Sequence, residues 1–478
     1  MAGAITGNGF DLQPSSEQVA LSSNYITNFD FLNQYLPDTY EKEFERYGNR
    51  TVASFLRLVG AEMPSNSDLI KWAEQGRLHT KYTDVTTPTA AAASTAVWTI
   101  GDTLLPGSGS IAVRVGQTVM LTKNTGGANL KALVTVVDTA AGTITLAYYG
   151  ANHTGVVTDK YTMFIYGSEF AKGTPGMVGS LEADDVFFEN KPIILKDRYA
   201  VSGSDMAQIG WVEVTTENGA SGYLWYLKSE HETRLRFDDY LETAMLEAVP
   251  ALVGSGASAA IGNGTDVANA PTGAGSEGVF YVVNNRGNVW SGGNPNVLGD
   301  FDSIIQRLDK QGSIEENVIF VDRQFGFDID DMLAAQNSYG AGGTSYGLFD
   351  NDEEMALNLG FTGFRRGYDF YKSDWKYLND PTMRGGLPTG AGSGRINGLL
   401  VPAGSTSVYD QILGKNAKRP FLHVRYRASE TEDRRYKTWI TGSAGGANNS
   451  SLDAMEVNFL SERAVCTLGA NNFFLFQE

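Results

Sequence analysis

The sequence predicts an α+β fold in which a small β-barrel, one long helix and a second α/β region follow one another along the chain. Three observations predict it. Residues 97–166 contain β-branched and aromatic runs separated by turn signals such as PGSGS and DTAAG. Residues 222–249, GYLWYLKSEHETRLRFDDYLETAMLEAV, carry apolar side chains at helical spacing. Beyond Pro250, apolar runs typical of strands buried on both faces alternate with short helical patterns.

The composition is that of a folded protein with an acidic surface. The chain has 478 residues, 42% of them apolar, and 37 basic against 55 acidic side chains give a formal charge of −18. Such a surface repels phosphate, which argues against binding duplex DNA through a basic face. The single cysteine, Cys466, excludes an intrachain disulfide and indicates either a reducing compartment or a fold that is indifferent to redox state. The sequence shows no signal-peptide pattern and no long uncharged apolar window, so we expect no membrane partner and assembly in the cytosol.

The first part of the chain predicts an arm and then an excursion. Residues 1–23 are small and polar, and residues 24–60 predict one or two short helices broken at Pro37 and Gly48. We expect this aromatic-rich segment to dock on another part of the molecule or on a neighbour. The sequence on either side of the barrel predicts the two legs of one excursion, with the barrel as an inserted module.

The segment 222–249 predicts a helix of roughly 28 residues, a rod about 40 Å long. Pro250 ends the helix because proline cannot continue it. Asp238 interrupts the apolar stripe near its middle, and charges of both signs cover the remaining surface. A rod with one narrow apolar face is typical of a spine that supports flat layers. The predicted stripe consists of Leu224, Leu227, His231, Leu235, Leu241, Met245 and Ala248.

A glycine-rich loop, residues 254–278, separates this helix from the second α/β region. Residues 338–394 are rich in loops, and residues 419–476 predict strands whose side chains alternate between buried and exposed. Between the two loop regions the predicted elements are the strands VFYVV (279–283) and NVIFVD (317–322) and the helices FDSIIQRLDKQG (301–312) and FDIDDMLAAQN (327–337).

No residue is identified as catalytic, cofactor-binding or metal-binding. The four histidines, His79, His153, His231 and His423, lie in different segments, and none has the spacing of a zinc site. His231 lies on the helical stripe and Cys466 in the apolar run AVCTLG, so we expect packing roles for both.

The glycine-rich and acidic motifs also favour structural explanations. GTSYG (343–347) lacks the strand and helix that flank a serine-hydrolase elbow. GAGSEG (273–278) precedes a predicted strand, where a dinucleotide fingerprint would open a helix. DIDDM (328–332) and DNDEEM (350–355) lack the glycine and glutamate of a helix-loop-helix calcium site, and solvated helix starts explain both. Nothing in the sequence selects a carboxylate pair for glycoside cleavage.

Three segments carry a resemblance to a known family. WAEQGRLHTKY (72–82), IILKDRYAVSG (193–203) and GYLWYLKSEHETRLRFDDYLE (222–242) look most like segments of the major capsid proteins of crAss-like phages. The order of arm, excursion with an inserted barrel, spine helix, α/β domain and returning strands resembles the Hong Kong 97-type fold of tailed-bacteriophage major capsid proteins. This likeness in layout covers nearly the whole chain.

The resemblance implies a division of the chain into domains. The expected parts are an N-terminal arm at 1–67, an extended loop at 68–98 and 167–215, an inserted β-barrel domain at 99–166, a peripheral domain at 216–275 and 431–478 with spine helix 222–249, and an axial domain at 276–430.

The resemblance also implies a function. The chain would be a major capsid protein, not an enzyme, that self-assembles into hexamers and pentamers forming the icosahedral head around the double-stranded DNA of a tailed phage. Its partners would be its own copies, portal, auxiliary or decoration proteins, and DNA held by non-specific enclosure, without a cofactor. It would assemble in the bacterial host cytoplasm and reside in the virion capsid. No lysine–asparagine pair for covalent cross-linking is identified.

The physics of the excursion agrees with this interpretation, and two alternatives stay open. A two-stranded excursion is not stable alone, and a packed copy supplies a surface for it; obligate contacts of this kind bury upward of roughly 2,000 Å². The first alternative is another phage structural protein (tail, decoration or fibre) whose barrel is a binding module, although no repeat of constant period appears. The second is a polysaccharide-acting or other carbohydrate-binding enzyme, although the aromatic residues alternate along strands as core residues do.

Overall fold

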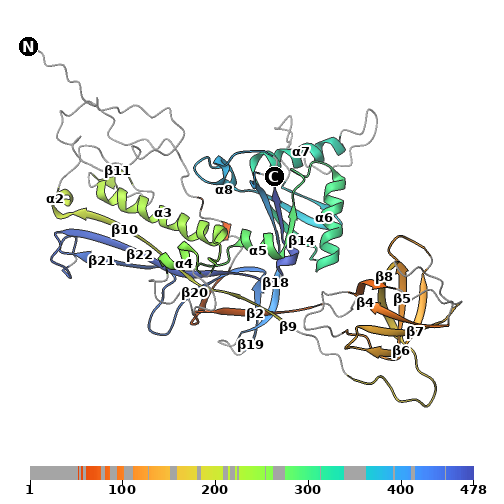
Figure 1. The fold of residues 1–478 in the computed structure, drawn as a ribbon. Coiled ribbons are helices and arrows are strands. Elements are labelled where there is room, and N and C mark those ends of the chain that lie inside the picture. The colour runs from red at the N-terminus through yellow and green to blue at the C-terminus, as the bar shows by residue number, and fades with distance from the viewer. Residues whose placement is uncertain are drawn as a thin grey trace, which may run out of the picture. The chain divides into compact units, whose positions relative to one another are not determined.

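The computed structural model describes residues 52, 55–56, 61–76, 81–86, 94–101, 111–127, 129–150, 159–179, 185–207, 214–215, 221–222, 225–252, 254–261, 275–312, 314–337, 362–390, 393–410, 415–446 and 448–478. The chain divides into two compact units. One is Trp72–Phe188, and the other combines Met1–Lys71 with Glu189–Glu478. Figure 1 shows the elements of both units.

The smaller unit is built on a closed barrel. Its strands are β3 (Lys81–Thr86), β4 (Thr95–Ile100), β5 (Gln117–Lys123), β6 (Leu130–Asp138), β7 (Thr143–Tyr148) and β8 (Lys160–Ser168), in the order β3-β4-β7-β6-β5-β8 (Figure 1). Strand alternation places one set of side chains inside, where Trp98, Leu121 and Met163 are completely buried. The indole Nε1–H of Trp98 donates to the Tyr148 hydroxyl at 2.8 Å. The predicted barrel is therefore confirmed.

The first two strands of the barrel begin before residue 99. β3 lies wholly, and β4 mostly, within 68–98, the segment that we expected to form a leg of the extended loop. Tyr82 and Val85 of β3 are buried inside the barrel. The physical reason is closure, because a sheet becomes a barrel only when its two outer strands pair, and here β3 pairs with β8.

Two further strands, β2 (Ile70–Gln75) and β9 (Asp185–Asn190), form a two-stranded sheet, which we call the β2–β9 ribbon. The rings of Trp72 and Phe188 lie 6.3 Å apart, and Lys71 Nζ lies 3.1 Å from a carboxylate oxygen of Glu189. Val186 is 44% exposed and Phe187 69%. The ribbon is therefore open to solvent around Val186 and Phe187, whereas Ile70 and Asn190 at its end are buried.

The larger unit contains a five-stranded sheet centred on the long strand β22 (Ala454–Thr467). Strand β10 (Ile193–Ser202) pairs antiparallel along one edge of β22, and β20 (Leu422–Arg427) and β21 (Lys437–Gly442) share the other edge. Strand β1 (Ala61–Ser65) pairs with β20 in parallel. Every second side chain of β10 is exposed, so the sheet has one covered face and one face in solvent.

Helix α3 (Trp225–Glu247) lies on the covered face of this sheet (Figure 1). Phe237 and Leu241 of the helix pack in one cluster with Val457 and Phe459 of β22. The rings of Phe237 and Phe459 have centroids 5.7 Å apart. The long helix predicted for 222–249 is therefore confirmed, with ends two or three residues inside the predicted ones.

The predicted apolar stripe of α3 is correct only towards its end. Leu241 and Met245 are buried as expected, but Leu227 is 44% exposed. The buried row runs instead through Phe237, four residues before Leu241, because its large ring fills the space over β22. Of the other predicted members, His231 and Leu235 are half buried. Ala248 lies beyond the end of the helix, and Leu224 lies outside the described residues.

Val52 and Phe55 are hydrogen-bonded to a second side of helix α3. The main-chain N–H of Val52 donates to Asp239 Oδ1 at 2.8 Å, and that of Phe55 donates to Glu242 Oε1 at 2.6 Å. Both carboxylates belong to buried residues, where an unpaired charge is costly. The ring of Phe55 stacks on Trp375 with centroids 4.3 Å apart. This part of 24–60 thus docks on its own chain, one of the two possibilities that the sequence left open.

A six-stranded sheet forms the rest of the core. Its strands are β13 (Asn288–Trp290), β23 (Phe474–Gln477), β17 (Ile396–Pro402), β14 (Glu316–Val321), β16 (Tyr368–Asp374) and β15 (Gly363–Arg366), in that spatial order. Phe320 of β14 packs on one face with helix α5 (Val279–Arg286). Ile319 and Val321 pack on the other face with α6 (Leu298–Gln311) and α7 (Arg323–Asn337). Cover on both faces explains the continuous apolar runs of β14 and β17.

The run VFYVV (279–283) forms helix α5, so the strand predicted there is wrong. Val279, Phe280, Val282 and Val283 are all buried, and a short run that is buried throughout does not reveal its period. Gly287 follows the helix, where a Cβ would lie 2.7 Å from the Val283 carbonyl oxygen. The predictions of β14, α6 and α7, and of strands within 419–476, are confirmed.

The remaining elements are short. Strands β18 (Ser405–Asp410) and β19 (Lys415–Pro420) form an antiparallel pair, which we call the β18–β19 ribbon. The others are β11 (Val214–Thr215) with β12 (Ser221–Gly222), helices α2 (Gly203–Met206), α4 (Gly256–Ile261) and α8 (Lys376–Asn379), and the 3₁₀ turns η3 (Arg384–Gly386) and η4 (Ala470–Asn472).

Candidate functional site

The described residues among those that the sequence singled out for possible chemistry do not form a metal centre. Within the part of the chain that the structure describes, no three or more His, Cys, Asp or Glu side chains gather as a metal site would need. His79, His153, GTSYG (343–347) and DNDEEM (350–355) lie outside the described residues.

His423 and Cys466 lie directly opposite each other on β20 and β22, a pairing that the sequence analysis missed. A histidine beside a cysteine is the arrangement of thiol nucleophiles. Here, however, burial raises the pKa of the Cys466 thiol to about 12 and lowers the pKa of His423 to about 4. Both groups are therefore neutral at pH 7, and His423 Nδ1 lies 3.2 Å from the Pro420 carbonyl oxygen. The pair packs and does not supply a thiolate.

The glycine-rich run GAGSEG (273–278) opens helix α5, whereas the sequence analysis placed a strand after it. A helix N-terminus behind glycines is a common place for a phosphate. The space is filled, because a Cβ at Gly278 would lie 2.6 Å from the Ala248 nitrogen and one at Gly275 2.6 Å from the Val249 carbonyl oxygen. The Gly278 N–H donates to the Ala248 carbonyl at 2.8 Å. The chain after α3 thus occupies the position that a pyrophosphate would need.

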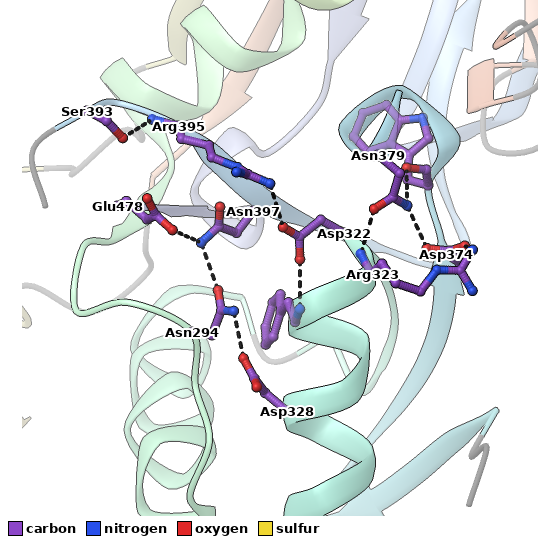
Figure 2. Close-up of polar contacts among 12 residues, drawn as sticks. Asn294, Asp322, Arg323, Asp328, Asp374, Asn379, Ser393, Arg395, Asn397 and Glu478 are labelled. Carbon is purple, nitrogen blue, oxygen red and sulfur yellow. Dashed lines mark hydrogen bonds and ion pairs between the residues drawn. The ribbon is translucent and has the colours of Figure 1, made fainter. Parts of the chain in front are cut away.

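A polar cluster surrounds the start of α7 (Figure 2). The buried Asp322 caps this helix, because its Oδ1 accepts the Phe325 N–H at 2.7 Å, and Arg395 Nη2 lies 3.2 Å from its Oδ2. Burial raises the pKa of Asp322, although the Phe325 N–H and the Arg395 guanidinium act in the opposite direction. The Arg323 N–H donates to Asn379 Oδ1 at 2.7 Å. These bonds fix the helix start against its neighbouring loops.

The same cluster extends along α7 through side-chain amides (Figure 2). Asn397 Nδ2 donates to Asn294 Oδ1 at 2.8 Å, and Asn294 Nδ2 donates to Asp328 Oδ2 at 2.7 Å. Glu478 Oε2 accepts the Gly390 N–H at 2.8 Å. These bonds tie separate segments together, and Asn397 Oδ1 is the atom of this cluster that is buried without a hydrogen-bond partner among the described residues.

The acidic run DIDDM (328–332) lies inside α7 and not at a helix start, because α7 begins at Arg323. Asp328 accepts from Asn294 and from Gln324 Nε2, the latter at 3.0 Å. Asp330 pairs with Lys372 Nζ at 2.5 Å. The carboxylates of Asp328 and Asp330 are therefore already bonded to other side chains of the same protein.

The described surface instead offers places where a protein could bind. Among the described strands, neither the β2–β9 ribbon nor the β18–β19 ribbon pairs with a third strand. Two-stranded sheets are marginally stable in water unless another surface supports them. Both ribbons are therefore candidate assembly surfaces.

The larger unit also contains two cavities. One, of about 340 Å³, opens at the base of the β18–β19 ribbon, and its apolar lining includes Val318, Phe320, Val401, Ala403, Pro420 and Leu422. The other, of about 320 Å³, lies beside α3 and includes Leu195, Phe237, Tyr240 and Ala244. Sequence analysis could not find either, because each is assembled from separate strands and helices.

Comparison with known proteins finds solved structures that are distantly similar to this chain. No protein family and no curated protein matches it. Solved structures similar to it include a chain from Microbacterium phage Oxtober96, with 9% identity over 94% of this chain and 96% of that one and a TM-score of 0.38. A chain from Mycobacterium phage Ogopogo has 11% identity over 92% and 96%, with a TM-score of 0.39. The capsid of a native GTA particle has 8% identity over 93% and 95%, with a TM-score of 0.37.

These likenesses are too distant to establish a family, since the TM-scores stay below 0.5 and the identities at or below 11%. Separately, a search of the described helices finds none long and apolar enough to cross a bilayer.

Proposed function

We propose that the chain is a major capsid protein of a tailed bacteriophage, a subunit that is not an enzyme and that builds a closed shell from its own copies. The observation that carries this proposal is the β2–β9 ribbon, which pairs with no third described strand and whose Phe187 is 69% exposed. Such a ribbon needs a second surface. Identical copies related by symmetry supply one, and the resemblance of three sequence segments to phage capsid proteins points to this kind of assembly.

The side-chain chemistry supports a structural role. His423 and Cys466 are neutral and buried, Asp322 caps a helix, and Asp330 is paired with Lys372. Each of these four groups has a structural partner or a protonation state that opposes a reaction.

In this proposal the subunits have the Hong Kong 97-type fold, and the sequence is most like those of crAss-like phages. Helix α3 serves as the spine of the peripheral domain and the six-stranded sheet forms the axial domain. The inserted barrel then begins with β3 and the strand β23 joins the axial domain, while the other domain limits are those predicted from the sequence. Hexamers and pentamers build the icosahedral head, with portal, auxiliary or decoration proteins as partners. Double-stranded DNA is held by enclosure, because a subunit charge of −18 repels phosphate. Assembly takes place in the bacterial host cytoplasm, and the subunit resides in the virion capsid.

Expression of the full chain alone, followed by sedimentation and negative-stain electron microscopy, tests the proposal. We expect shells, tubes or rings of capsomers that appear sharply above a threshold concentration, because many weak contacts must form together. Rods or trimers would favour another phage structural protein. A monomer at every concentration would contradict the proposal.

A further inference from the structure

We propose that the side chain of Asn190 is a junction that fixes the base of the β2–β9 ribbon to helix α5 and strand β22, and so sets the point beyond which the ribbon opens. Asn190 is the last residue of β9 and is 4% exposed. Val186 and Phe187, earlier in the same strand, are 44% and 69% exposed. This change from exposed to buried residues along one strand locates the base of the ribbon at Asn190.

The hydrogen-bonding capacity of the Asn190 amide is fully used. Its Nδ2 donates to the Glu277 carbonyl oxygen at 2.9 Å and to the Val465 carbonyl oxygen at 2.7 Å. Its Oδ1 accepts from the Ser276 hydroxyl at 2.9 Å, from the Glu277 N–H at 2.9 Å and from the Lys191 N–H at 2.8 Å. An asparagine amide offers two N–H groups and one oxygen with two lone pairs, so these bonds leave nothing over.

The bonds join segments that are far apart in the sequence. Val465 lies in β22, two residues beyond Arg463, where the pairing of β22 with β10 ends. The residues 276–277 lead into α5, and the next residue is held at the end of α3, because the Gly278 N–H donates to the Ala248 carbonyl oxygen at 2.8 Å. One side chain therefore connects the ribbon to the sheet around β22 and, through the start of α5, to the end of α3.

Along the rest of the ribbon the described contacts are weaker. Among the described strands, β2 and β9 pair only with each other. The ion pair of Lys71 with Glu189 lies at the surface, with side chains 55% and 39% exposed, so it contributes little. A strand pair with few buried contacts opens locally at a low free energy, whereas a buried and fully bonded residue stays closed. Residues 185–188 therefore open more readily than Asn190 and its partners.

The junction itself does not depend on what the protein assembles into, but its use in assembly rests on the proposed shell-forming function. The ribbon is a candidate assembly surface, and a firm base limits the conformations that it must give up when a neighbouring copy binds. A loosened base raises this entropic cost at every copy of the contact. Asn190 is then a positioning residue for assembly, although it touches no partner itself.

Hydrogen exchange of the unassembled chain, measured by mass spectrometry of overlapping peptides, provides the first test. In the unchanged chain, 185–188 should exchange at least about tenfold faster than Lys191, Glu277 and Gly278. Asn190→Asp should speed exchange at these three residues by about tenfold or more, because it removes both donors and places a carboxylate against two carbonyl oxygens. Equal exchange on the two sides of residue 190, or no change in the variant, would overturn the junction.

A matched control separates a junction from a general loss of stability. Asn288 Nδ2 also donates to two carbonyl oxygens in the same unit, those of Asn471 at 2.7 Å and Phe473 at 3.2 Å. Asn288→Asp should therefore leave exchange at Lys191 unchanged. Exchange in β14 serves as the reference for the whole unit. If Asn190→Asp speeds exchange in β14 as much as at Lys191, the residue is a general stabiliser and the proposal is wrong.

Ser276 allows a test of the bonds themselves. Ser276→Ala removes one donor to Asn190 Oδ1 and should speed exchange at Glu277 by about two- to tenfold. In a chain that already carries Asn190→Ala, the same substitution should add nothing, because the partner of the hydroxyl is gone. Additive effects of the two substitutions would contradict the junction.

Particle assembly tests the positioning role. Circular dichroism first checks that the variants are folded. At equal concentration, Asn190→Asp subunits should give at least about tenfold fewer closed particles than Asn288→Asp subunits, because the loss recurs at every copy of the contact. Equal yields would contradict the role in assembly alone. Unchanged subunits that form no particles would contradict the proposed function, and the exchange experiments would still decide whether Asn190 is a junction.

Discussion

The barrel of β3–β8 and the five-stranded sheet around β22 are both mainly antiparallel, but they are completed in different ways. The barrel closes through the pairing of β3 with β8 and covers its own core, with Trp98 and Leu121 completely buried inside. The sheet around β22 stays open, and its covered face depends on Phe237 and Leu241 of α3. Closure makes one region self-sufficient, while the other relies on elements brought from far along the chain.

The open sheet keeps a second face in solvent. Its strand β10 exposes Ile194 by 52% and pairs Arg198 with Glu456 across the sheet at 3.2 Å. An antiparallel sheet tolerates such a face, since only one side must be buried. The comparison therefore predicts that damage to α3 unfolds the larger unit and leaves the barrel intact.

Producing Trp72–Phe188 as a separate fragment should reveal the largest difference between the two regions. We expect this fragment to fold alone, because its core is contributed by its own strands. Thermal unfolding followed by circular dichroism should show one cooperative transition, and proton NMR should show dispersed amide signals. A fragment without a cooperative transition would contradict the self-sufficiency of the barrel.

Phe237→Ala should cost the larger unit about 3–5 kcal/mol of unfolding free energy, since a fully buried ring is removed. Leu227→Ala, on the exposed side of the same helix, should cost only about 0.5 kcal/mol or less. Urea unfolding of the unassembled chain measures both. Equal losses from the two substitutions would show that α3 does not use the face described here.

Acid should weaken the open sheet through His423. Its pKa is lowered from 6.5 to about 4 by burial, so the unfolded chain binds a proton that the folded chain refuses. This contribution is complete above pH 6.5 and is lost as the pH falls towards 4, by about 3 kcal/mol in total. Denaturation at several pH values should show this slope in the unchanged chain. His423→Gln should lack it, and an identical slope in that variant would assign the effect to other groups.

Arg198→Ala should have the smallest effect, about 0–1 kcal/mol. Its guanidinium pairs with Glu456 at 3.2 Å, but the Arg198 side chain is 61% exposed and water screens the pair. A double-mutant cycle with Glu456→Ala measures the coupling, which should fall further at high salt. A coupling well above this range would mean that the solvent-facing side of the sheet stabilises it more than the comparison allows.

Local patterns in the sequence were sufficient for several elements. The barrel followed from alternating β-branched runs, and α3 followed from a long amphipathic segment ending at Pro250. Which residues of α3 form the buried row was harder to predict, because Phe237 is buried against β22, a strand that lies far away in the sequence. VFYVV was misread because a run of five apolar residues, four of them buried, contains no polar residue that would reveal a helical period.

The candidate site depended almost entirely on tertiary structure. His423 and Cys466 face each other only because β20 and β22 pair in one particular register. The apolar cavity joins Val318, Val401 and Leu422 from three strands. Exposed Phe187 could be recognised only after β9 was seen to pair with β2 and with no other described strand. Sequence periodicity contains none of this pairing information.

The pairing of β10 with β22 also fixes an order of events on the ribosome. Ile193 and Arg463 are register partners, so β10 must wait for roughly 250 further residues, about 12–50 s of synthesis at usual rates, before its neighbour emerges. The barrel is complete long before then. We expect nascent chains arrested before Ala454 to resist protease within the barrel strands while β10 is still cut. The hydrogen-bonding edge of β10 is thus without its partner for about half of the time needed to make the protein.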